Sequence, residues 1–174
     1  MSSDTVDDAT TAVGAPAGPE TRYGCAVTES RGQLVLHATV EGYLAAVKAM
    51  ADDGYTMCVD LTVVDFLVHP GRPLPDGIEP ERFEVVVNFL DIAAGRRIRV
   101  RVQVPVDDPT LPTLFDIHPG TEAMEREAFD MFGISFTDHP DLTRILMPED
   151  WEGHPHRKDY EVGAIPVQFK EAHS

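Results

Sequence analysis

The stretch RFEVVVNFLDIAAGRRIRVRVQVP, residues 82–105, decides the fold of this chain. It predicts two strands joined at Ala94-Gly95. The second strand alternates strictly, with an apolar row facing one way and a polar row facing the other: Ile98, Val100, Val102 and Val104 against Arg97, Arg99, Arg101 and Gln103. This pattern is typical of an antiparallel sheet with one face on the core, so the arginine row is either a solvated face or a surface that holds an acidic partner.

The segments before this hairpin predict more strands and one helix. CAVTES and QLVLHATV flank a turn at Arg31-Gly32. EGYLAAVKAMADDG predicts a helix capped by Thr39 and ended by Gly54, with an apolar stripe made of Tyr43, Leu44, Val47, Met50 and Ala51. TMCVDLTVVDFLV follows as a mostly buried strand, and the proline-rich HPGRPLPDGIEPE is a loop.

Downstream, a second helix is expected in a strongly acidic region. It spans Glu122 to Phe132, ends at Gly133, and has an apolar stripe of Met124, Ala128, Met131 and Phe132. Arg126 lies one turn from both Glu122 and Asp130, which predicts two weak ion pairs along the helix. Short turns follow, because His139-Pro140 and His154-Pro155 force extended backbone before each proline.

These elements predict an α+β fold in which a mixed or antiparallel sheet carries one or two helices packed on a face. Residues 1–21 are small, acidic and rich in Pro and Gly, and we expect a disordered N-terminal tail there. Residues 22–152 form the α+β domain. Residues 153–174 are expected to form an extended C-terminal docking arm, since they hold too little apolar content to pack alone.

Composition narrows the function. The 174 residues include 30 acidic and 14 basic side chains, a net charge of -16, which disfavours nucleic acid and anionic lipid as partners. No apolar run approaches the roughly 20 residues of a membrane span, and no signal-peptide pattern is present, so we expect a cytoplasmic chain. Cys25 and Cys58 stand far apart and cannot supply the four ligands of an iron–sulfur cluster.

Two stretches, Glu125–Leu146 and Gly153–Tyr160, are dense in ionisable and aromatic residues, and they admit two interpretations. In the first, His154 and His156 chelate zinc together with His139, Asp130 or Asp159, and Glu125 or Glu127 acts as the general base. The HExxH, GxSxG, P-loop and GxGxxG patterns are all absent. In the second interpretation, basic side chains bridge irregular segments through carboxylates, and aromatic side chains anchor another protein.

The same two stretches, EREAFDMFGISFTDHPDLTRIL (Glu125–Leu146) and GHPHRKDY (Gly153–Tyr160), resemble the signature of the thirty-kilodalton subunit family of respiratory complex I, which is the C subunit of NADH-quinone oxidoreductase. The matching residues are Glu125, Arg126, Glu127, Asp130, Met131, Phe132, Gly133, Ile134, Phe136, His139, Pro140, Asp141, Leu142, Arg144, Ile145, Leu146, Gly153, His154, Pro155, Arg157, Lys158, Asp159 and Tyr160. The chain departs from the family pattern at Ala123, Met124 and His156.

The resemblance implies a peripheral-arm subunit of a proton-translocating NADH:quinone oxidoreductase, on the cytoplasmic side of a bacterial membrane. Its partners would be the large quinone-site subunit and adjacent iron–sulfur subunits. It implies no catalytic, metal or cofactor residue in this chain, because other subunits bind the flavin, the clusters and the quinone. The alternatives are the homologous subunit of a membrane-bound hydrogenase or related donor:quinone dehydrogenase, and a metalloenzyme using His139, His154 and His156.

Under this interpretation the signature residues serve structure and partner docking. The helix with Glu125, Arg126, Glu127 and Asp130 fixes the acidic segment to the sheet. A docking ridge is formed by Phe132, Phe136, His139, Pro140, Asp141 and Leu142, and Gly133 is a further structural or docking residue. Charged links, within the subunit or to its partner, come from Arg144, Arg157, Lys158 and Asp159. The remaining docking residues are Gly153, His154, Pro155 and Tyr160.

Overall fold

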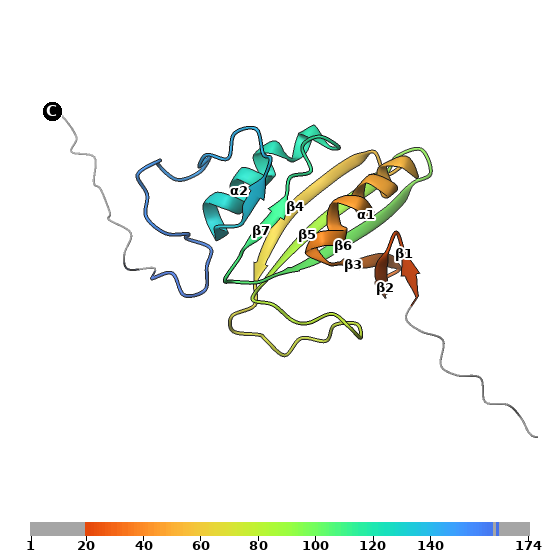
Figure 1. Cartoon of the computed structure of the whole chain (residues 1–174), viewed down its shortest axis with the longest axis horizontal. Helices are drawn as coiled ribbons and strands as arrows, with labels where there is room; N and C mark the ends of the chain where they lie inside the picture. The colour runs from red at the N-terminus through yellow and green to blue at the C-terminus, as the bar shows by residue number, and fades with distance from the viewer. Residues whose placement is uncertain (1–19, 162, 164–174) are drawn as a thin grey trace, which may run out of the picture.

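The computed structural model describes residues 20–161 and 163, and its centre is one mixed sheet. The sheet has six strands in the order β1-β2-β3-β6-β5-β4 (Figure 1). Neighbouring strands are antiparallel except β3 and β6, which are parallel. The strands are β1 (Thr21–Arg22), β2 (Cys25–Ser30), β3 (Gln33–Ala38), β4 (Met57–Asp65), β5 (Phe83–Asp91) and β6 (Arg96–Val104). The predicted α+β class is confirmed.

The two predicted hairpins are confirmed. Between β2 and β3, Arg31 and Gly32 both have positive φ, 54° and 75°, as the favoured two-residue hairpin turn requires. Between β5 and β6 the chain turns through Gly95, and Val87 lies opposite Val100. The apolar row of β6 is fully buried, so the alternation seen in the sequence is the alternation of the sheet.

The first helix, α1 (Val40–Asp52), begins as predicted. The Thr39 side chain accepts a hydrogen bond from the Gly42 backbone N–H at 3.1 Å. Its buried side chains are Tyr43, Ala46, Val47 and Met50. The prediction for Leu44 was wrong, because that side chain is 38% exposed and Ala46 occupies the inward position between Tyr43 and Met50.

Strand β4 corrects another prediction, since it is not mostly buried. It lies at the end of the sheet and alternates, with Leu61, Val63 and Asp65 inward and Val64 outward. Apolar content alone predicted burial, but an edge strand with one covered face buries only every second side chain.

The second helix, α2 (Glu122–Phe132), has the predicted bounds and ends at Gly133 in the left-handed conformation. It follows a short 3-10 helix, η1 (Pro119–Thr121), and packs beside β4. A two-stranded parallel sheet of β7 (Thr110–Pro112) and β8 (Ser135–Thr137), which the sequence did not predict, brackets it. Both helices contribute to one apolar core on the same face of the large sheet (Figure 1).

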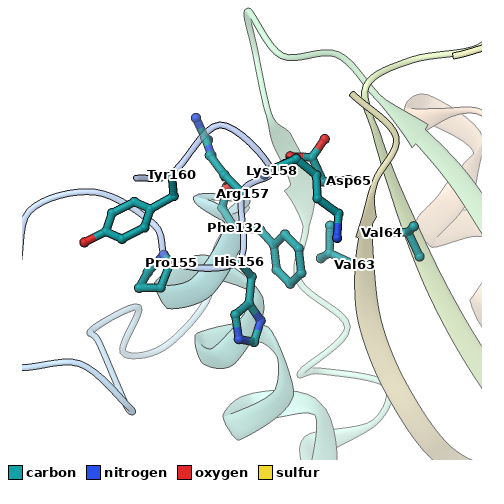
Figure 2. Close-up of a pocket in the computed structure, with 9 residues that line it drawn as sticks. All are labelled: Val63, Val64, Asp65, Phe132, Pro155, His156, Arg157, Lys158 and Tyr160. Carbon is teal, nitrogen blue, oxygen red and sulfur yellow. Dashed lines mark hydrogen bonds between the residues drawn. The ribbon is translucent and has the colours of Figure 1, made fainter. Parts of the chain in front are cut away.

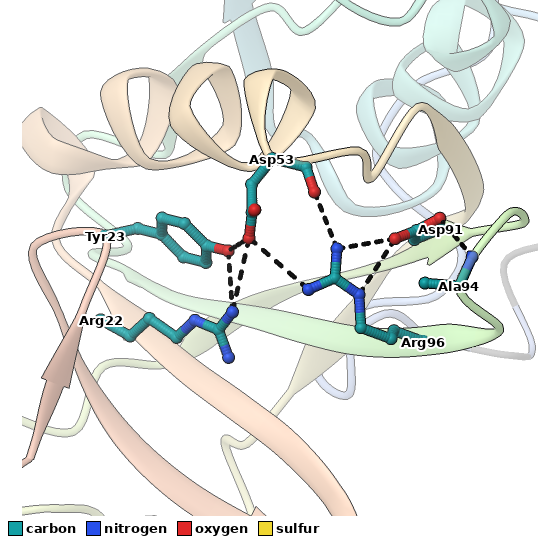
Figure 3. A network of polar contacts seen from close by, with 6 residues as sticks. All are labelled: Arg22, Tyr23, Asp53, Asp91, Ala94 and Arg96. Carbon is teal, nitrogen blue, oxygen red and sulfur yellow. Dashed lines mark hydrogen bonds and ion pairs between the residues drawn. The ribbon is translucent and has the colours of Figure 1, made fainter.

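A polar network fastens the end of α1 to the β5–β6 hairpin and to β1 (Figure 3). Arg96 donates to the Asp91 carboxylate at 2.7 Å and to the Asp53 carbonyl at 2.8 Å. The Asp53 carboxylate also accepts from Tyr23 and Arg22. The Ala94 N–H and Arg96 together lower the pKa of Asp91, so this carboxylate stays ionised. Most of the expected N-terminal tail, residues 1–19, lies outside the described residues.

Candidate functional site

Asp130, on α2, organises the first part of the acidic segment. Its side chain is fully buried. One oxygen accepts from Arg144 at 2.5 Å, and the other accepts from the backbone N–H groups of Ile145, Leu146 and Met147 at 3.0, 2.8 and 2.8 Å. Burial alone would raise the pKa of Asp130, but these donors outweigh it, and the net effect is a lowered pKa. A single ionised carboxylate therefore fixes the backbone of three consecutive residues and the side chain of the arginine before them.

The C-terminal end of α2 is bound by the second signature stretch. The last carbonyls of a helix have no partner inside it. Here the Asp130 carbonyl bonds to His154 Nδ1 at 3.0 Å, the Met131 carbonyl accepts from the His156 N–H at 3.0 Å, and the Phe132 carbonyl accepts from Arg157 Nε at 2.6 Å. Burial lowers the pKa of His154, which favours a neutral ring.

Gly133 permits this close approach. Its φ is +74°, and a Cβ built there would lie 2.6 Å from Arg157 Nη2 and from His154 Nε2. No side chain fits between the end of α2 and the GHPHRKDY stretch, and the left-handed backbone is itself strained for any residue with a Cβ. The glycine that ends the helix is therefore also the point of contact between the two signature stretches.

Arg126 joins the helix to the turn after it, but not in the way predicted. Its Nη1 atom donates to Glu122 at 3.1 Å, which confirms one of the two expected ion pairs. The expected pair with Asp130 is wrong, because Asp130 points into the interior and is occupied by Arg144. Arg126 instead donates to the carbonyls of Thr143 and Arg144 at 3.1 and 3.2 Å.

Glu125 and His139 form a buried polar contact beneath the helix. The fully buried Glu125 carboxyl accepts from the Thr113 hydroxyl and from the Leu114 N–H, and burial raises its pKa. His139 Nδ1 accepts from the Asp141 N–H at 3.1 Å, which assigns the ring hydrogen to Nε2, 3.1 Å from the Glu122 carbonyl. His139 therefore holds the His139-Pro140 turn against α2.

Asp65, the last residue of β4, anchors the second signature stretch, GHPHRKDY, to the sheet. It accepts from Arg82 at 2.8 Å and from the Lys158 backbone N–H at 2.9 Å, and Arg82 also binds Asp159 at 2.6 Å. Burial would raise the pKa of Asp65, but Arg82 and the N–H donors outweigh it and lower it. Asp65 and Arg82 were not among the predicted site residues, although an acid at the inward position after Leu61 and Val63 was a readable signal.

Between β4 and the second stretch lies an open hollow of about 470 Å³ (Figure 2). Its lining combines apolar and basic side chains, since Val64, Phe132 and Pro155 lie alongside Arg157 and Lys158. His156 is exposed and packs edge-on against Phe132, with 5.3 Å between ring centroids. Aromatic and basic groups around a hollow are typical of a protein interface.

The expected docking ridge is only partly exposed. Phe136 is 2% exposed and belongs to the apolar core, so its prediction as a ridge residue was wrong, because β8 turns it inward. Leu142 also packs against the core, whereas Pro140 and Asp141 are exposed. Beyond them Ile145 is 40% and Leu146 60% exposed. We call residues 139–160 the docking segment.

The three histidines proposed for a metal site do not converge. His139 contacts Glu122, His154 contacts Asp130, and His156 contacts Phe132. Within residues 20–161 and 163 no three His, Cys, Asp or Glu side chains are grouped to hold a metal ion. No cofactor site is evident in this part of the chain.

No helix among the described residues is long and apolar enough to cross a membrane.

Comparison with known sequences gives one family. Residues 36–165 match the family model described as respiratory-chain NADH dehydrogenase, 30 Kd subunit. The chain is 40% identical over 149 residues to the C subunit of NADH-quinone oxidoreductase from Salinispora arenicola, covering 84% of this chain and 57% of that one. It is 40% identical over 150 residues to the protein of the same name from Saccharopolyspora erythraea, covering 84% and 56%. The chain thus spans a little over half the length of these relatives.

Two solved structures share the fold. A trypsin-resistant fragment of Nqo5 is 33% identical with a TM-score of 0.61, over 68% of this chain and 90% of that one. A chain of an archaeal membrane-bound sulfane sulfur reductase is 22% identical with a TM-score of 0.67, over 85% and 88%. That second likeness concerns the fold alone. With its signature residues placed as described and its family model matched over most of its length, the chain belongs to the 30 kDa subunit family of respiratory-chain NADH dehydrogenase.

Proposed function

We propose that this chain is a non-catalytic, peripheral-arm subunit of a proton-translocating NADH:quinone oxidoreductase, and that it braces the large quinone-site subunit. In this proposal the whole complex transfers electrons from NADH to quinone, and other subunits hold the flavin, the iron–sulfur clusters and the quinone. The chain sits on the cytoplasmic side of the bacterial membrane. Membership of the 30 kDa family and the likeness to the two NADH-quinone oxidoreductase relatives support this assignment.

One observation carries the docking role: the backbone of Ile145 and Leu146 is held in place while the side chains of these two residues face outward. Asp130 fixes the backbone of Ile145 and Leu146, yet their side chains are 40% and 60% exposed. A segment without helix or strand is ordinarily mobile, and ordering it during association weakens binding. Here the ordering is already achieved by a buried carboxylate. Covering these side chains removes apolar surface from water, which contributes about 25 cal/mol per Å² before the costs of association are subtracted.

The charges in the docking segment support a partner that carries charged groups of both signs. Glu149, Asp150 and Glu152 follow Leu146 in the sequence and are exposed. The hollow between β4 and the second stretch is lined by Arg157 and Lys158. Charged groups at the rim of an interface set orientation and association rate more than affinity. The docking segment thus offers exposed apolar side chains together with acidic and basic ones.

The test replaces one exposed apolar residue by a neutral polar one. Leu146→Gln keeps the side-chain length, and the matched control is Ile92→Gln, in the β5–β6 turn, where Ile92 is 67% exposed. Native electrophoresis of membranes measures the assembled complex, and the thermal midpoint of the purified chain reports folding. We expect Leu146→Gln to lower the assembled fraction at least tenfold while Ile92→Gln leaves it unchanged. Equal assembly of both variants contradicts the docking role.

A further inference from the structure

The sheet face opposite the helices carries a row of basic side chains along β6. At one end of the row the charge is compensated. Arg101 donates to Glu84 at 2.6 Å, and Gln103 donates to the other oxygen of the same buried carboxylate at 2.6 Å. This end of the row is an internal polar cluster of the kind that stabilises cross-strand neighbours.

The other end of the row carries Arg97 and Arg99, and Arg31 lies nearby in the turn between β2 and β3. Among the residues that the structure describes, Arg31, Arg97 and Arg99 form no ion pair, whereas the neighbouring Arg96 and Arg101 are both paired. Arg99 is half-buried, and its Nε atom donates to Asn88 at 3.0 Å. This bond orients the guanidinium plane and leaves both terminal amino groups without an acceptor in the described part of the chain.

The three arginines line two adjoining hollows of about 290 and 470 Å³. Both hollows are lined by Gln33 and Arg99. The first also reaches Arg97, and the second reaches Arg31. Among the residues that the structure describes, Asp60 is the only acidic side chain that lines either hollow, and it lies exposed on the edge strand β4. We call Arg31, Arg97 and Arg99 the arginine patch.

A shortage of carboxylates does not explain the arginine patch. The chain has 30 acidic and 14 basic side chains, and Arg82, Arg126 and Arg144 each pair with a described carboxylate. Cations placed together repel one another. Three neighbouring arginines without ion pairs therefore destabilise the isolated subunit unless an anion covers them. Such a group in a chain of net charge -16 is therefore a candidate binding surface.

We propose that the arginine patch binds a short acidic segment of a partner protein. Arg97 and Arg99 are alternate residues of one strand, so their side chains emerge about 7 Å apart. That spacing matches two carboxylates on alternate residues of an extended chain, and each guanidinium can hold both oxygens of one carboxylate. A long polyanion would extend past the patch and meet the acidic remainder of the subunit, which disfavours nucleic acid and anionic membranes. This inference is independent of the docking segment.

The test uses the full chain and the fluorescently labelled peptide acetyl-EAEAEAE-amide, with acetyl-QAQAQAQ-amide as the uncharged control. The variants are Arg97→Gln and Arg99→Gln. Lys48→Gln, on the exposed side of α1, is the matched control because it removes one positive charge from the other face of the sheet. Fluorescence anisotropy should show saturable binding of the glutamate peptide that each arginine variant weakens at least fivefold. Lys48→Gln should change binding less than twofold.

Four results would overturn the proposal. They are no saturable binding at millimolar peptide, equal binding of the two peptides, an equal loss in the lysine and arginine variants, and tighter binding of a single-stranded oligonucleotide or of phosphatidylserine vesicles than of the peptide. If Arg99→Gln lowers the thermal midpoint of the chain, the binding result for Arg97→Gln decides, since the Arg97 side chain is exposed and forms no hydrogen bond with a described residue.

Discussion

The Oδ2 atom of Asp130 lies 2.8 Å from the amide nitrogen of Leu146, so a fully buried acid positions one of the most exposed apolar side chains of the subunit. The acid is on a helix of the core, and the leucine is in a segment with no helix or strand. This contact joins the stability of the domain to the shape of its docking segment.

Replacing Asp130 by asparagine should lower the free energy of unfolding by about 3 kcal/mol, because the buried site loses its ion pair with Arg144 and part of its acceptor capacity. Urea unfolding measures this change. Hydrogen exchange of the Ile145, Leu146 and Met147 amides should accelerate, since all three donate to this carboxylate. The control Asp116→Asn, at an exposed position, should change stability by less than about 0.5 kcal/mol. Equal effects of the two variants would refute the organising role of Asp130.

The same carboxylate predicts a pH dependence. The pKa of Asp130 is lowered in the folded chain relative to about 3.9 in an unfolded one. The stabilisation is therefore complete above the unfolded pKa and is lost as the pH falls through the folded pKa. The stability difference between the wild-type chain and Asp130→Asn should be largest near pH 7 and shrink below about pH 4. Urea unfolding at several pH values checks this, and a difference that stays constant down to about pH 2 would count against it.

Gly133→Ala should destabilise the chain more than backbone strain alone explains. Its control is Gly24→Ala, where φ is +76° and no atom lies within 4 Å of the added Cβ. Both changes strain the backbone by about 1 kcal/mol. At Gly133 the Cβ also meets Arg157 and His154 at 2.6 Å, and we expect a further loss of about 1–3 kcal/mol from this overpacking. Thermal unfolding of the two variants measures the difference, and equal losses would show that the contact is not tight.

Arg82→Gln should cost about 3 kcal/mol, since it leaves the Asp65 carboxylate buried without its cation. Asp159→Asn removes the other partner of Arg82, but that side chain is 53% exposed, so we expect a loss below about 1 kcal/mol. Urea unfolding ranks the two variants. A larger loss for Asp159→Asn than for Arg82→Gln would reverse the roles given to the buried and the exposed acid.

Local features of the fold were readable from the sequence. The α2 bounds followed from its apolar period and from Gly133, whose left-handed conformation ends the helix within a few residues. The β5–β6 alternation was equally local. In contrast, β7 and β8 hold three residues each, too few to show a period of two.

The site was readable only in part, because its key contacts are long-range. The family signature identified Glu125 and Asp130 as important, but helical spacing predicted Arg126 as the partner of Asp130. The actual partner, Arg144, lies in an irregular segment whose path no local rule predicts. The contact between Asp65 and the Lys158 backbone joins positions 93 residues apart, so it could not be predicted without the folded structure.

Photo-crosslinking in membranes tests the central claim, that the docking segment holds another subunit, most directly. Leu146 is replaced by p-benzoylphenylalanine, and the same replacement at Ile92 is the control, since both side chains are more than half exposed. We expect the label at position 146 to join this chain to another subunit of an NADH:quinone oxidoreductase, identified by mass spectrometry, and the label at position 92 to join it to none. Equal labelling at the two positions, or no cross-linked partner at position 146, would contradict the claim.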